Sequence, residues 1–157
     1  MADKNKTNAM RILDGKKLSY REHEYSGTTV GTEVAQLLGQ APERVFKTLV
    51  TVGKSGNHYV FVIPVAEELD LNAAAAVVGE KSVEMVKSKE LLPLTGYIHG
   101  GCSPIGMKKL FRTTVHESAK GQETIFFSGG RIGLQIETSP ENLLAVVPFT
   151  YADLIRK

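Results

Sequence analysis

The stretch that decides the fold is RVFKTLVTVGKSGNHYVFVIPVA, residues 44–66. It contains two runs of β-branched and aromatic residues, RVFKTLVTV and HYVFVIPVA, separated by GKSGN. Glycine and asparagine between two such runs are typical of a β-hairpin. We therefore predict two antiparallel strands joined by a short turn.

A lysine lies near the start of the first of these strands. Period-two alternation puts Lys47 on the same face as Leu49, and puts Thr48 on the face of Phe46 and Val50, so neither face is plainly polar. The ammonium either reaches the rim of the sheet and is solvated, or stays inside and needs an anion to offset its desolvation. The pattern alone favours the solvated lysine and leaves the second interpretation open.

Length and composition predict one soluble domain. A chain of 157 residues with 42% hydrophobic and 23% charged residues is long enough to bury a core without disulfides or metal. No apolar run approaches the roughly 20 residues of a membrane span, and the start MADKNKTNAM has no hydrophobic signal core. We expect a single compact cytoplasmic domain over residues 1–157, with no linker and no membrane contact. The net charge of +2 points only weakly to an anionic partner.

Several segments carry helix signals. Capping residues and apolar spacing predict a helix that begins at Thr7 or Asn8, and another that begins at Thr32 and stops at Gly39. The remaining predicted helices are LDLNAAAAVVG (69–79, closed by Gly79), KSKELLPLTG (87–96, interrupted by its proline) and SPENLLAVV (139–147, with Ser139 as its cap).

Strand signals alternate with these helices in no regular rhythm. Predicted strands are LSYREHEY (18–25), KSVEMV (81–86), the hairpin of ETIFFSGG (123–130) with IGLQIETS (132–139), and FTYADLI (149–155). The order lacks the steady strand, helix, strand alternation of a doubly wound sheet. We therefore expect a mixed α/β (α+β) domain with several hairpins.

Three potential motifs do not hold up. VGKSG resembles the end of a phosphate-binding loop, but that loop needs a glycine where Thr48 stands. The four histidines are dispersed and form no metal-binding pair, so we expect neither a metal nor a cofactor. The single cysteine, Cys102, could in principle pair with His99, but a small semi-buried thiol is the simpler interpretation.

The segment TGYIHGGCSPIGMKKL, residues 95–110, carries more information. Gly100 and Gly101 lie where an apparent strand gives way to a loop, and paired glycines let backbone N–H groups approach a phosphate or an ester oxyanion. The alternative is a plain turn, followed by a short basic helix that carries Lys108 and Lys109. A second glycine pair, which follows Ser128, favours a site surrounded by tight turns.

The motifs VFKTLV, PVAEELDLNAAA, KSVEMV, TGYIHGGCSPIGMKKL and SGGRIGLQIE, in this order, resemble the YbaK/EbsC family of aminoacyl-tRNA deacylases. The likeness extends from about residue 18 to residue 155. It is greatest to the Cys-tRNA(Pro) deacylase branch, free-standing relatives of the editing domain of some bacterial prolyl-tRNA synthetases. The resemblance implies a curved, partly barrel-like mixed sheet flanked by helices, with a pocket for the acceptor end of tRNA.

The resemblance also implies roles for particular residues. The essential lysine of the family falls on Lys47 and the backbone oxyanion region on Gly100 and Gly101, while further pocket residues fall on Tyr25, Thr48, Ser128 and Gln135. Many members have an aspartate where this chain has Gln135, which keeps hydrogen-bonding capacity but carries no charge. Lys108 and Lys109 are candidate contacts to the tRNA backbone. On this view the phosphate of the terminal nucleotide compensates the charge of Lys47.

The implied reaction needs no protein nucleophile, because in cysteine-specific members of the family the thiol of the substrate attacks its own ester. The protein brings the thiol and the ester into reacting range and stabilises the developing oxyanion. We therefore expect a trans-editing enzyme that removes cysteine from tRNA(Pro), with prolyl-tRNA synthetase as a candidate partner. Two alternatives stay open: hydrolysis of another small mischarged residue such as alanine, and a non-catalytic module that binds tRNA ends or a synthetase.

Overall fold

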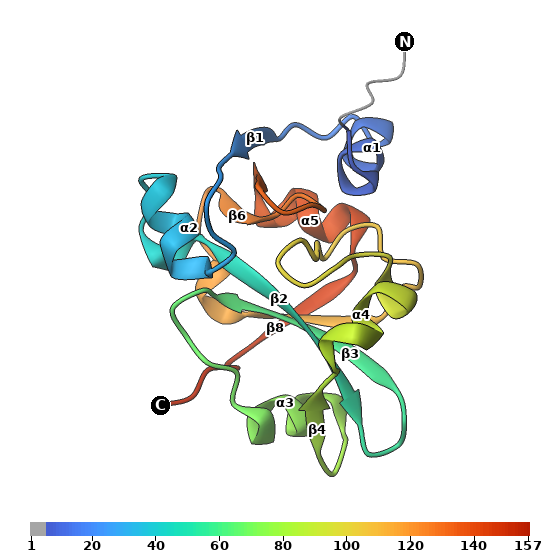
Figure 1. Cartoon of the computed structure of the whole chain (residues 1–157). Coiled ribbons are helices and arrows are strands. Elements are labelled where there is room, and N and C mark those ends of the chain that lie inside the picture. Colours follow the sequence, from blue (N-terminus) through green and yellow to red (C-terminus); the bar gives the residue numbers. More distant parts are fainter. Residues whose placement is uncertain (1–5) are drawn as a thin grey trace.

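The computed structural model describes residues 6–157, which form two β-sheets and their flanking helices (Figure 1). The larger sheet has the strand order β4–β2–β3–β5–β8. Its strands are β2 (Phe46–Gly53), β3 (His58–Pro64), β4 (Val83–Met85), β5 (Arg112–His116) and β8 (Phe149–Ala152). The smaller, antiparallel sheet has the order β1–β7–β6 and consists of β1 (Arg21–Glu24), β6 (Ile125–Ser128) and β7 (Leu134–Thr138). The predicted mixed α/β fold is confirmed.

The predicted hairpin is the antiparallel pair β2–β3, in which Lys47 lies opposite Ile63. The expected alternation holds along β2. Phe46 and Val50 are buried in the largest hydrophobic cluster, whereas Leu49 packs against a second cluster on the other face of the sheet. Both faces of the hairpin are therefore covered, which explains why its sequence is apolar on both sides.

The two sheets meet where β2 begins. An isolated parallel bridge joins Val45 to Phe126 of β6, immediately before β2 enters the larger sheet. On its other edge, β2 pairs with β4 only from Thr51 onward. The first half of β2 therefore has an edge that no strand of its own sheet covers, and this edge borders the site described below.

The helices of the described chain are α1 (Asn8–Gly15), α2 (Gly31–Leu37), α3 (Leu71–Val78), α4 (Ser88–Thr95) and α5 (Pro140–Val146), with short 3₁₀ helices η1 (Pro42–Arg44) and η2 (Glu117–Ala119). Three predicted caps are present: Thr7 and Ser139 each accept a hydrogen bond from a backbone N–H three residues later, and Gly79 closes α3 in a left-handed conformation. None of these helices is long and apolar enough to cross a membrane.

Four expectations about individual helices and strands fail. Thr32 lies inside α2, whose N-cap is Val30, and α4 continues through Pro93 to Thr95. The apparent strand before Gly100 and the basic helix after it are both irregular loop, residues 96–111. Strand β5 was not predicted, because its short polar sequence RTTVH gives no alternation signal, and it forms only by pairing with β3 and β8.

The caps of α3 and α2 can be compared by substitution. The Asp70 carboxylate accepts hydrogen bonds of 3.0 Å from the N–H groups of Asn72 and Ala73, whereas Thr32 caps nothing. Asp70→Ala should therefore lower the free energy of unfolding by about 1 kcal/mol. Thr32→Ala should leave it unchanged or raise it slightly, since alanine has the higher helix propensity. Urea unfolding of both variants tests this; an equal loss in both would contradict the cap assignment.

Candidate active site

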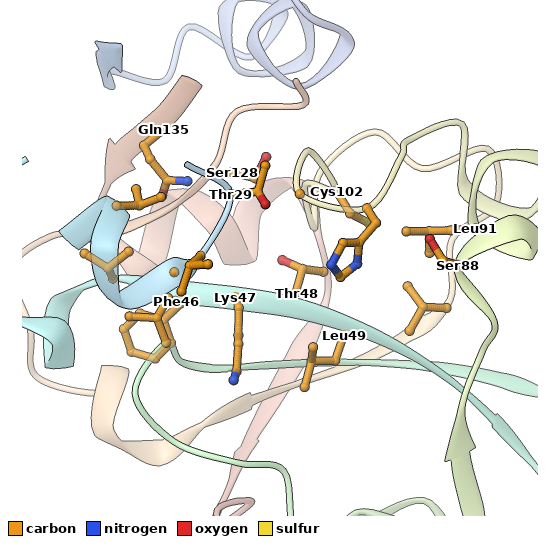
Figure 2. A pocket seen from close by; sticks show the side chains of 18 of the residues that line it. Thr29, Phe46, Lys47, Thr48, Leu49, Ser88, Leu91, Cys102, Ser128 and Gln135 are labelled. Atoms are coloured by element: carbon orange, nitrogen blue, oxygen red, sulfur yellow. The ribbon is translucent and has the colours of Figure 1, made fainter. Parts of the chain in front are cut away.

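A cavity of about 560 Å³ lies between the open edge of β2 and the smaller sheet (Figure 2). Its volume is within the range of about 300–1,000 Å³ that is typical of small-ligand sites. Six of the residues predicted from the sequence line it together: Tyr25, Lys47, Thr48, Gly100, Ser128 and Gln135. They come from segments up to 110 residues apart, and only the packing of the two sheets brings them together.

Two oxygen atoms of the cavity wall have no hydrogen-bond partner in the part of the chain that the structure describes. They are Oγ1 of Thr48 and Oε1 of Gln135, both buried. A buried polar atom without a partner is costly, and such atoms are rare in folded proteins unless a ligand or water completes them. Because both residues line the cavity, these oxygens are candidate partners for a bound molecule.

Lys47 lines the cavity, but its ammonium does not point to the polar centre. Figure 2 shows Lys47 and Thr48 leaving β2 in opposite directions, as alternation along a strand requires. The Lys47 side chain is half-buried, and its ammonium makes no hydrogen bond or ion pair with any of residues 6–157. Burial lowers the pKa of Lys47, while the charges of Glu68 and Glu67 oppose this shift. The expected inward orientation is therefore not seen; the lysine is instead an unpaired cation at the margin of the cavity.

The two glycine pairs have a packing role that the sequence did not reveal. Gly100 has φ +87°, and a Cβ on it would lie 3.1 Å from Thr29. A Cβ on Gly101 would lie 2.9 Å from the backbone nitrogen of Ile132 and 3.0 Å from Cα of Arg131. The loop that contains the first pair therefore packs directly on the loop that follows the second.

The amides of these loops are not equally available to a ligand. The N–H of Gly101 donates to the carbonyl of Ile98 at 3.0 Å, and Gly101 does not line the cavity. In the second pair, the N–H of Gly129 donates to Leu134, and that of Gly130 donates to Oγ of Ser128. Of the predicted oxyanion donors, only the Gly100 amide lies at the cavity with no acceptor among the described residues.

Cys102 also lines the cavity and is buried. Burial raises the pKa of its thiol to about 12, so the thiol is neutral at physiological pH. A nucleophilic cysteine needs the thiolate. His99 lines the same cavity, but among the described residues no hydrogen bond joins it to Cys102. This geometry agrees with the interpretation of Cys102 as a small buried thiol.

The two predicted tRNA-backbone lysines lie outside the cavity. Lys108 and Lys109 are exposed, in the irregular loop that replaces the expected helix. The stem of Lys108 packs over Gly96, and its amine is 3.5 Å from the carbonyl of Pro93.

Sequence reasoning missed the apolar wall of the cavity. This wall includes Val30, Val34, Val45, Val65 and Met85. In the sequence these residues look like ordinary core positions, and nothing in their spacing distinguishes a cavity wall from a filled core. No group of three or more His, Cys, Asp or Glu side chains within residues 6–157 is arranged to hold a metal ion.

Residues 26–146 match the model of the aminoacyl-tRNA editing domain, and this match covers most of the chain and nearly all of the cavity. The chain belongs to this family. The resemblance to YbaK/EbsC deacylases that the sequence motifs predicted is confirmed. A relative in Enterococcus faecalis (strain ATCC 700802 / V583), described as "Putative Cys-tRNA(Pro)/Cys-tRNA(Cys) deacylase EbsC", is 44% identical over 155 residues, which are 97% of this chain and 94% of the relative.

Solved structures of the editing-domain type have the same fold. The "hypothetical protein APE2540" superposes with a TM-score of 0.87 at 25% identity, over 96% of this chain and all of the other. A "putative trans-editing enzyme for prolyl tRNA synthetase" superposes with a TM-score of 0.85 at 26% identity, over 96% of each chain.

The contact between the two glycine loops can be tested by adding one methyl group. Gly101→Ala should destabilise the fold by about 1–3 kcal/mol, because the new Cβ meets backbone atoms that cannot rotate away. Gly15→Ala is the matched control: no atom lies within 4 Å of its Cβ position, so stability should stay constant or rise by about 0.4–1 kcal/mol. Thermal unfolding gives both values, and a fully stable Gly101→Ala variant would show that the loops are not in close contact.

Proposed function

We propose that this editing-domain protein removes cysteine that has been mischarged onto tRNA(Pro), acting in trans on the released aminoacyl-tRNA. The observation that carries the proposal is the cavity of about 560 Å³, whose wall includes Thr48 and Gln135, each with a buried, unpartnered oxygen, and has the unpaired Lys47 at its margin. A small aminoacyl group needs hydrogen-bond partners, and the phosphodiester that follows it needs a cation. The relative described as a Cys-tRNA(Pro)/Cys-tRNA(Cys) deacylase supports the choice of cysteine.

The proposed reaction uses the thiol of the substrate as the nucleophile. The cysteinyl sulfur loses its proton and attacks the ester carbonyl carbon, so a C–S bond forms and the C–O bond to the ribose breaks. The ribose oxygen takes up a proton, and the products are a cyclic thiolactone and free tRNA. Intramolecular attack of this kind can supply about 7–11 kcal/mol through positioning alone.

The residues of the cavity then bind and orient the substrate. Thr48 and Gln135 would hydrogen-bond the aminoacyl group, and the amide of Gly100 is the candidate donor to the developing oxyanion. The apolar wall around Val45 and Val65 excludes water. Cys102, with its neutral thiol, would take no chemical part.

Binding of the rest of the tRNA involves residues outside the cavity. Lys108 and Lys109 are exposed cations that would contact the phosphate backbone. Because tRNA is charged in the cytoplasm, we place the protein there. Prolyl-tRNA synthetase, which releases the mischarged substrate, is the candidate protein partner.

A deacylation panel tests the proposed function. Purified protein is incubated with cysteinyl-, alanyl- and seryl-tRNA(Pro), and the products are analysed for thiolactone. Cysteinyl-tRNA(Pro) should be cleaved with thiolactone formation, and seryl-tRNA(Pro) poorly, because a hydroxyl is a far weaker nucleophile than a thiolate.

The Cys102→Ser variant should be as active as the unmodified protein in the same panel. Preferential cleavage of alanyl-tRNA(Pro) would instead establish hydrolysis by water, and binding without turnover would establish a non-catalytic module. Loss of activity in a folded Cys102→Ser variant, with a trapped cysteinyl-enzyme, would contradict the substrate-thiol mechanism.

The role of the unpaired cation can be tested with Lys47→Met, which keeps the apolar stem and removes the charge. A charge-assisted hydrogen bond to phosphate contributes about 1.5–3 kcal/mol, so kcat/KM should fall about 10- to 150-fold while unfolding is unaffected. Lys47→Arg should also be impaired, since a planar guanidinium does not replace a compact ammonium. Lys54→Met, at the exposed β2–β3 turn, is the control. Equal activity of the Lys47 and Lys54 variants would remove Lys47 from the mechanism.

A further inference from the structure

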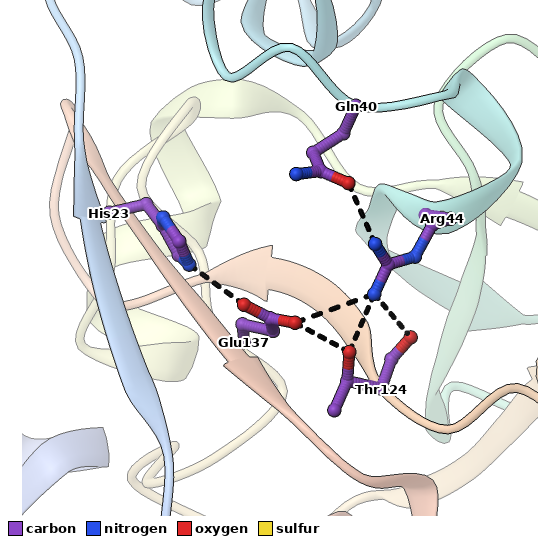
Figure 3. A network of polar contacts seen from close by, with 5 residues as sticks. All are labelled: His23, Gln40, Arg44, Thr124 and Glu137. Atoms are coloured by element: carbon purple, nitrogen blue, oxygen red, sulfur yellow. Dashed lines mark hydrogen bonds and ion pairs between the residues drawn. The ribbon is translucent and has the colours of Figure 1, made fainter.

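A network of polar side chains lies next to the cavity, on the smaller sheet and the residues that precede β2 (Figure 3). Glu137 is at its centre. One carboxylate oxygen accepts from Nε2 of His23 at 2.9 Å, and the other accepts from Oγ1 of Thr124 at 2.6 Å and from Arg44 at 3.4 Å. Arg44 also donates to Oγ1 of Thr124 at 2.6 Å and to Oε1 of Gln40 at 2.7 Å.

Glu137 is ionised in this network. Burial of its side chain opposes ionisation, but hydrogen bonds from Thr124 and His23, together with the nearby charge of Arg44, hold its pKa below the usual value. The rings of His23 and Phe126 are 5.0 Å apart, and the Arg44 guanidinium lies 5.0 Å from the centre of the Phe126 ring. The carboxylate and the aromatic ring therefore fix both basic side chains.

The strand register connects this network to the cavity. His23 of β1 is the cross-strand partner of Gln135, and Gln135 is the partner of Ser128 in β6. Side chains of directly opposite residues have Cβ atoms about 4.5–5.5 Å apart, which is within reach of a hydrogen bond between an imidazole and an amide. Yet Oε1 of Gln135 has no partner among the described residues, and Nε2 of His23 is bonded to Glu137 instead.

We propose that Glu137 is a positioning residue that holds the His23 imidazole away from Gln135 and so keeps the Gln135 amide free for the aminoacyl group of the substrate. Arg44 and Thr124 in turn fix the carboxylate. This inference rests on the proposed function, because it assigns Gln135 to substrate binding. A network that served only to join the sheets would affect stability without acting through Gln135.

A double-mutant cycle separates these two roles. Glu137→Gln leaves one acceptor oxygen where the carboxylate has two. We expect Arg44 and Thr124 to retain this oxygen, so that the NH2 group faces His23 and the imidazole turns to Gln135. The kcat/KM for cysteinyl-tRNA(Pro) should then fall at least about tenfold, as expected when a substrate-binding group is misplaced. In the Gln135→Ala background the same substitution should have no further effect. Adding His23→Phe to Glu137→Gln should restore activity, because the competing imidazole is gone. Glu123→Gln, an exposed carboxylate beside Thr124, is the matched control and should change nothing.

A second measurement does not depend on activity. The side-chain amide signal of Gln135 in ¹H–¹⁵N spectra, assigned by its loss in Gln135→Ala, should shift in Glu137→Gln, stay constant in Glu123→Gln, and return toward its original position in His23→Phe/Glu137→Gln. Should Glu137→Gln fail to fold, Glu137→Asp withdraws the carboxylate by one methylene and should shift the same signal.

An unchanged Gln135 signal, or additive losses of activity in the cycle, would overturn the inference. A protein that cleaves none of the mischarged tRNAs would overturn the proposed function, and the Gln135 signal would still decide whether Glu137 positions that amide.

Discussion

The parallel bridge between Val45 and Phe126 joins the two sheets, and the site lies at this junction. It attaches the start of β2 to the smaller sheet, while the remainder of β2 pairs with β3 in the larger one. Because β4 covers β2 only from Thr51 onward, the strand leaves an open edge beside the junction. The cavity forms at this edge, where residues from both sheets face each other.

The two glycine pairs matter for the packing of the loops at the cavity as well as for binding. Gly101 has no room for a side chain because the backbone at Arg131 and Ile132 lies against it. Close packing of these loops places Gly100 in the wall of the same cavity as Ser128 and Gln135. One glycine of the first pair is thus a packing residue, while the other retains an amide that a ligand can use.

The groups that line the cavity can bind and orient a substrate, and none of these lining residues is an activated nucleophile. Its thiol is neutral because it is buried, and the polar groups of its wall include the unpartnered oxygens of Thr48 and Gln135 and the amide of Gly100. Such a site suits a substrate that supplies its own nucleophile, which must be oriented and kept from water. The ionised Glu137 lies two residues after Gln135 in β7, outside the cavity lining. From there Glu137 and its basic neighbours can hold the cavity wall in place without adding charge to it.

Local signals in the sequence were enough to predict the β2–β3 hairpin, the caps at Thr7 and Ser139, the family, and six of the residues that line the cavity. Strand periodicity, caps and motifs each depend on short stretches of chain. Tertiary contacts set the direction of Lys47, the hydrogen bond that occupies the Gly101 amide and the network around Glu137. Strand β5 also belongs to this second group, since RTTVH becomes a strand only between β3 and β8. These features depend on contacts between residues distant in the chain, which no local pattern encodes.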